Sequence, residues 1–294
     1  MPFKFIVNSH PLYIHADLVS HHSKPLDRLM NGHMAEAQQG YAVFEDVDAK
    51  TFALFIQWAY SGFYSAPDFD TVTTRLSCEE PSTDGDAAID WLPAAYEDKP
   101  AEEVMPVEED SYLHGYSFGG SHNSKRASKM KGKLSYNNEP TTKNSSKDVL
   151  KDSFKNRKIT ARQESIVIPP PRPNQAPSED YTNIFLSHAQ LHVFADKYQI
   201  DSLKLLALEE LQITLAKFTL YSERTGDIVE LLRYIYANSG ESVPGVEDLR
   251  TLTTHYVGYE MDMLMRDENF KALMIEDGGP LLRDFMGMVR KRIL

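Results

Sequence analysis

The chain has 294 residues, a length that suits one large or two small domains. Its formal net charge is −12, and 25% of its residues are charged and 41% hydrophobic. No apolar run reaches the roughly eighteen residues of a membrane span, and no basic and then apolar signal peptide opens the sequence. Cys78 is the only cysteine, which excludes a disulfide within the chain and cysteine-based zinc fingers. We therefore expect a cytoplasmic or nuclear protein without a membrane partner.

The first part of the chain predicts short strands and a short helix. Apolar residues alternate over Phe3–Val7 and Leu12–Ile14, as in half-buried strands, and residues 8–11 between them have the composition of a hairpin loop. A helix is expected at Ala16–His22 and a third strand at Tyr41–Phe44. This order indicates a mixed α+β fold.

Two further helices are marked by their terminal residues. Ser23 is a typical N-cap and Gly32 a typical end for one of them, while Asp48 begins and Gly62 ends the other. Their apolar stripes are expected to face the core: Leu26, Leu29 and Met30 in the first, and Phe52, Phe55, Ile56, Ala59 and Tyr60 in the second.

Charge is polarised over the interval 65–182. Residues 65–110 hold fourteen acidic against two basic residues, and residues 111–172 hold thirteen basic against four acidic ones. Apolar residues recur there at neither the helical nor the strand period, so the interval predicts a disordered insertion from Ser65 to Ser178.

The insertion contains three segments that could bind a partner. Residues 124–133 and 155–158 are basic and could serve nuclear import or bind nucleic acid, and Trp91, Leu92 and Tyr96 could form a docking motif. The alternative is a solvated linker whose basic half offsets its acidic half. The acidic chain and the usual solvating role of charge runs favour that alternative, so nucleic acid is not an expected partner.

Helical periodicity returns at Asn183 and continues to the end of the chain. Ser187 and Asp201 are expected to cap two helices that end near Phe218. Four more are expected in an all-helical C-terminal extension, at residues 227–238, 246–264, 268–275 and 281–294.

The order of these features resembles the BTB/POZ domain, of the type common in filamentous fungi with a long insertion inside the fold. The residues that carry the resemblance are His15, Ser23, Gly32, Asp46-Val47-Asp48, Phe52, Trp58-Ala59-Tyr60-Ser61-Gly62 and the segment 188–211, HAQLHVFADKYQIDSLKLLALEEL. The resemblance implies a small sheet with a helical bundle, built from residues 1–64 and 183–218. Residues 65–182 would be the insertion and 219–294 the extension.

The resemblance also implies binding to proteins. Met34 and Glu36 stand where BTB adaptors of cullin-type ubiquitin ligases have a hydrophobic-x-Glu motif. The resemblance also implies Trp58 and Tyr60 as cullin contacts. The alternative is an ordinary loop in which Met34 packs back onto the core. The competing function is a self-associating scaffold or a nuclear regulatory protein. A homodimer through the BTB domain is expected, though not by the strand exchange of members with an additional N-terminal strand.

The sequence favours no enzyme. His188 and His192 have the spacing of two metal ligands on a helix, but no glutamate or third ligand accompanies them, so we expect two partly exposed histidines. Cys78 lies in the expected insertion, where no base would be held beside it. We expect no catalytic residue, no cofactor and no metal.

Overall fold

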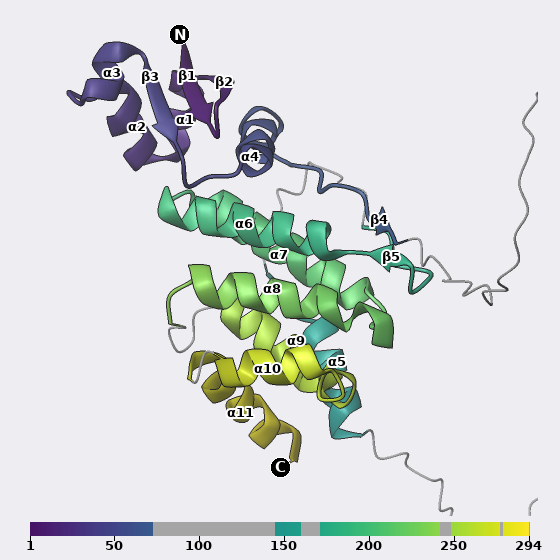
Figure 1. Ribbon diagram of the computed structural model, residues 1–294. Helices are drawn as coiled ribbons and strands as arrows, with labels where there is room; N and C mark the ends of the chain where they lie inside the picture. The colour runs from purple at the N-terminus through teal and green to yellow at the C-terminus, as the bar shows by residue number, and fades with distance from the viewer. Residues whose placement is uncertain (73–144, 160–170, 242–247, 277–278, 294) are drawn as a thin grey trace, which may run out of the picture. The chain divides into compact units, whose positions relative to one another are not determined.

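The computed structural model describes residues 1–72, 145–159, 171–241, 248–276 and 279–293, with side chains placed up to residue 290. Within them the protein is mixed α+β, mostly helical, with a small sheet near the N-terminus and helices towards the C-terminus (Figure 1). This confirms the predicted α+β class. Cys78, the segment with Trp91 and Tyr96, and the basic run 124–133 lie outside the described residues.

A three-stranded sheet opens the fold. Its strands, in the order β2-β1-β3, are β1 (Pro2–Val7), β2 (His10–His15) and β3 (Tyr41–Phe44), with β2 antiparallel and β3 parallel to β1. Asn8 and Ser9 form the hairpin turn with φ of 46° and 68°, so the expected four-residue loop is a two-residue turn. One sheet face buries its apolar side chains against the helices.

Four helices accompany this sheet: α1 (Ala16–His22), α2 (Lys24–Asn31), α3 (Ala35–Gln39) and α4 (Ala49–Ser61). The Ser23 hydroxyl caps α2 by accepting a hydrogen bond from the Leu26 amide. The Asp48 carboxylate caps α4, and Gly62 ends it with φ of 76°. These caps agree with the sequence, whereas helix α3 was not predicted.

The expected insertion contains ordered structure at its described positions. β4 (Asp70–Thr71) pairs with β5 (Glu179–Asp180), so its two ends meet in a small antiparallel ladder. Helix α5 (Ser146–Lys155) begins at a capping box formed by Ser145 and Asp148. The expectation of disorder is therefore wrong for this part.

Helix α5 escaped prediction because its apolar stripe is narrow. Phe154 is fully buried and contacts the rings of Tyr256 and Tyr259, and two lysines of α5 form ion pairs with Glu260. The helix is thus stabilised by a surface about a hundred residues further along the chain. That tertiary contact is invisible to a local count of apolar residues.

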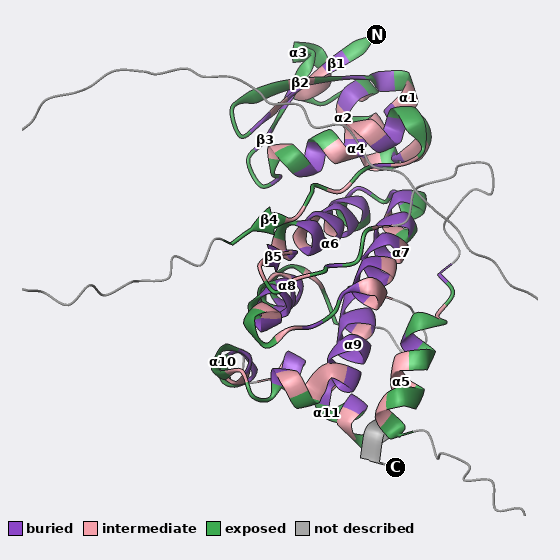
Figure 2. Cartoon of the chain, turned by 90° about the vertical axis from the view of Figure 1, so that its right-hand side faces the viewer, coloured by how far each residue is buried: buried purple, intermediate pink, exposed green. Residues whose placement is uncertain are grey.

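Helices α6 (Thr182–Lys197) and α7 (Asp201–Lys217) lie between two hydrophobic cores. One core contains residues of the sheet and of α1, α2 and α4 together with Leu191, Phe194 and Leu203 of this pair. The other joins Phe185 and Leu211 to the C-terminal helices. Figure 2 accordingly shows α6 and α7 with buried residues on most of their surface.

The remaining helices are the 3₁₀ turn η1 (Ser222–Arg224), α8 (Thr225–Asn238), α9 (Leu249–Leu264), α10 (Glu268–Glu276) and α11 (Pro280–Ile293). Helix α8 packs on α6, and α9 packs on α5, α8 and α11. Ser187, expected to cap a helix, lies inside α6 and donates a hydrogen bond to the Ile184 carbonyl. Because its hydroxyl is hydrogen-bonded inside the helix and caps no helix end, the expectation of a Ser187 cap is wrong.

Candidate protein-interaction surface

The predicted Met34 and Glu36 contacts lie at the start of the short helix α3. Met34 is the N-cap residue in an extended conformation, and its side chain is 55% exposed. Glu36 is half-buried in the first turn, where a carboxylate is favoured by the helix dipole. Gly40 ends the helix with φ of 75°, and α3 packs against α2 and β3 (Figure 1). The alternative in which Met34 packs onto the core is therefore wrong.

Trp58 and Tyr60 lie on different faces of α4. Trp58 is only 6% exposed and packs against the rings of His22 and Phe55, so its side chain belongs to the core. Tyr60 is 53% exposed. Residues two positions apart on a helix point to nearly opposite faces. Trp58 therefore offers no contact surface, whereas Tyr60 does. The expectations of a Trp58 contact and of an inward-facing Tyr60 are both wrong.

His15 holds the exposed Tyr60 in place. The Tyr60 hydroxyl oxygen accepts a hydrogen bond from the His15 backbone amide at 3.2 Å and lies 2.5 Å from Nδ1 of the same residue. This double contact ties the end of α4 to the end of β2. The tyrosine ring is thereby presented to solvent in one orientation.

The outer face of the sheet adds an exposed apolar surface that the sequence reading missed. Tyr13 and Tyr41 flank Lys4 in one cross-strand row, and Val43 neighbours Ile6 in the next. Tyr13, Tyr41 and Val43 are exposed, while Lys4 and Ile6 are half-buried. The alternation in Tyr41–Phe44 was the available signal, since the residues that alternate with the buried Ala42 and Phe44 are themselves apolar.

The two histidines with metal-ligand spacing are buried, not partly exposed as expected. Nδ1 of His188 lies 2.7 Å from the Tyr64 hydroxyl, and its Nε2 lies 3.4 Å from Oγ1 of Thr214. Burial lowers the pKa of His188 to about 3 and that of His192 to about 4. Among the described residues, no group of three or more His, Cys, Asp or Glu side chains could hold a metal ion.

Comparisons with models of known protein families, with curated proteins and with solved structures give no match. In the part of the chain that the structure describes, no helix is both long and apolar enough to cross a membrane. The exposed residues of the sheet and of α3 and α4 form the candidate interaction surface.

Proposed function

We propose that the chain is a protein-interaction module of the BTB/POZ type and acts as a substrate adaptor for a cullin-type ubiquitin ligase. The observation that carries the proposal is the side chain of Met34, exposed at the start of α3 with Glu36 in the same turn. A flexible thioether can repack into an apolar groove on a partner, and the adjacent carboxylate can fix the orientation.

The arrangement of the core supports a BTB-type domain built from two separated segments. The hydroxyl of Ser23, buried at the start of α2, donates a hydrogen bond to the Tyr198 carbonyl at 2.7 Å. The rings of Phe44 and Tyr198 stack with centroids 5.4 Å apart, and Phe52 and Phe55 both contact Phe194. Residues 1–64 and the helical pair α6–α7 thus share one core.

The adaptor proposal is tested by titrating the full chain with the N-terminal domain of a cullin in a calorimeter. We expect wild-type protein to bind and Glu36→Lys and Met34→Ser to weaken binding at least about tenfold, since central interface residues contribute most of the binding energy. Glu45→Lys and Met286→Ser are matched controls, because Glu45 is exposed and Met286 has the same 55% exposure as Met34. No binding by the wild type would refute the adaptor role.

A self-associating scaffold is the second candidate, and the exposed sheet face favours it. The row Tyr13–Lys4–Tyr41 and the neighbouring Val43 could bury apolar surface against a second copy of the chain. Light scattering decides between the candidates. A dimer that Tyr13→Ser with Val43→Ser converts to a monomer, without cullin binding by the wild type, supports the scaffold instead of the adaptor.

A further inference from the structure

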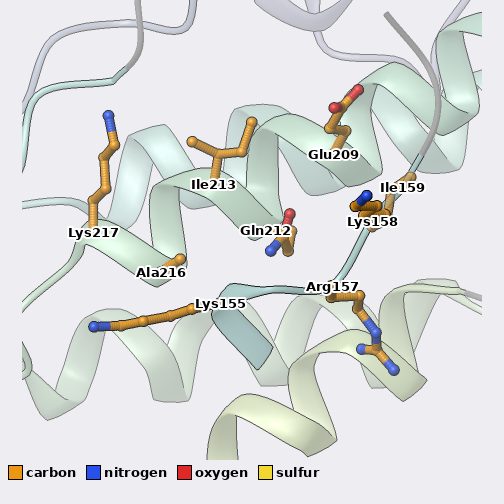
Figure 3. Close-up of a pocket in the computed structure, with 9 residues that line it drawn as sticks. All are labelled: Lys155, Arg157, Lys158, Ile159, Glu209, Gln212, Ile213, Ala216 and Lys217. Carbon is orange, nitrogen blue, oxygen red and sulfur yellow. The ribbon is translucent and has the colours of Figure 1, made fainter. Parts of the chain in front are cut away.

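A groove of about 470 Å³ lies between helix α7 and the chain that leaves helix α5 (Figure 3). Among the described residues, its lining contains four basic side chains, Lys155, Arg157, Lys158 and Lys217, and one carboxylate, that of Glu209. The groove thus combines a strong positive charge with a chain whose net charge is −12.

The two sides of the groove are fixed to each other. Gln212 of α7 is buried, and its side-chain amide donates a hydrogen bond to the Phe154 carbonyl at 3.0 Å. Phe154 precedes the basic residues 155–158 and Ile159 follows them, and both side chains are buried. The basic segment 155–158 is therefore anchored at both ends and keeps its place beside α7.

This anchoring changes the interpretation of that segment. As part of a linker it could have served as an extended import signal or a nucleic-acid tail. In the structure Arg157 is half-buried, and Figure 3 shows its guanidinium directed away from Gln212 and Ile213. The three lysines lie at the two ends of the groove, Lys155 and Lys217 at one end and Lys158 at the other (Figure 3).

The lysines are available to a ligand. Lys155 and Lys158 are exposed and form no ion pair within the described residues. Lys217 is half-buried and donates a hydrogen bond to the Pro171 carbonyl at 3.2 Å, and it forms no ion pair with any residue that the structure describes. Between the two ends, the half-buried Ile213 and Ala216 form an apolar floor.

We propose that this groove binds an acidic peptide segment of a partner protein. Its carboxylates would lie against Lys155 with Lys217 at one end and Lys158 at the other, while an apolar side chain between them packs on Ile213 and Ala216. Charge complementarity selects the acidic partner, and the apolar floor selects a peptide. A nucleic-acid strand fits less well, because the described residues that line the groove include no aromatic ring for a base to stack on.

Fluorescence anisotropy with the full chain tests the proposal, using a labelled Glu-Glu-Leu-Leu-Glu-Glu peptide at low salt. We expect saturable binding that weakens with salt and falls about tenfold in Lys155→Glu with Lys158→Glu, as two favourable charge contacts become repulsive. Lys24→Glu with Lys50→Glu is the matched control, since both lysines are exposed on the N-terminal part of the chain. A Lys-Lys-Leu-Leu-Lys-Lys peptide should bind the Lys155→Glu, Lys158→Glu protein better than the wild type.

Three results would overturn the proposal. The first is no binding of the acidic peptide by wild-type protein. The second is an equal loss in the control variant, which would reveal a general charge effect. The third is equally tight binding of a single-stranded RNA with the same number of charges, which would make the groove a polyanion site. The charge-swapped peptide keeps the test decisive if the Lys155→Glu, Lys158→Glu protein is less stable.

Discussion

The hydroxyl of Tyr64 lies 2.7 Å from Nδ1 of His188, and both side chains are buried although 124 positions separate them in sequence. Tyr64 follows the end of α4, and His188 lies in the middle of α6. The contact therefore joins the N-terminal segment to the helical pair that completes its core. Burial raises the pKa of the Tyr64 hydroxyl and lowers that of the imidazole, so both groups stay neutral at physiological pH.

Tyr64→Phe should lower the free energy of unfolding by about 1–3 kcal/mol. The substitution keeps the ring and leaves a buried imidazole nitrogen without its hydrogen-bond partner. Urea denaturation measures the change, with Tyr13→Phe as the control because Tyr13 is exposed on the sheet. Equal stability of the two variants would contradict the role assigned to the Tyr64–His188 contact.

Ser23→Ala should lower the free energy of unfolding by about 1–2 kcal/mol, because the hydroxyl both caps α2 and donates to the Tyr198 carbonyl. Ser153→Ala, at an exposed position of α5, is expected to change it by less than about 0.5 kcal/mol. Thermal unfolding distinguishes the two, and an unchanged midpoint in Ser23→Ala would contradict the prediction.

The stability contributed by the buried histidines should fall as the pH is lowered from about 6.5 to 4. In this window His188 and His192 become protonated in the unfolded chain. In the folded chain they stay neutral, because their pKa values are about 3 and 4. Each histidine then contributes a loss of up to about 1.4 kcal/mol per pH unit. Asp227 acts in the opposite direction between pH 3.8 and 6, because burial raises its pKa to about 6.

Substitution separates these contributions. Between pH 6.5 and 4, His192→Leu removes one group that takes up its proton in the unfolded chain but not in the folded one. The slope of the unfolding free energy against pH should therefore decrease in this window by up to about 1.4 kcal/mol per pH unit. Gln39→Leu is the control, because it replaces an exposed side chain without a titratable group and should leave the slope unchanged. The same slope in His192→Leu as in the wild type would show that His192 is not buried in its neutral form.

Phe154→Ala should detach α5 from α9. The ring is fully buried against Tyr256 and Tyr259, and removing a buried phenylalanine ring costs about 3–5 kcal/mol. Hydrogen exchange should then increase across residues 146–155 before it increases in α6. Uniform exchange across the chain would mean that α5 is not a separately stabilised element.

Capping residues in the sequence predicted those helices whose ends are set by hydrogen bonds within a few positions. Ser23, Asp48 and Gly62 cap helices through contacts within a few positions, so the boundaries of α2 and α4 could be read directly. Helix α5 could not, because its stability comes from Phe154 meeting α9. Trp58 was misassigned because a family motif gives order along the chain and not the face of a helix on which each residue lies.

The interaction surface could be predicted only where it consists of residues close together in sequence. Met34 and Tyr60 are exposed, yet the sheet row Tyr13–Lys4–Tyr41 depends on a strand register that pairs Lys4 with Tyr41, far along the chain. The basic groove needs both α5 and α7, which are separated in sequence by the end of the expected insertion and by helix α6. Surfaces assembled from distant segments become visible only once the chain is folded.

Hydrogen exchange of the full chain with and without the N-terminal domain of a cullin tests the adaptor role most directly. We predict protection of residues 33–40, which contain Met34, Glu36 and helix α3, and of the end of α4 around Tyr60. Protection confined to other segments, or none at a cullin concentration that saturates a known adaptor, would contradict it.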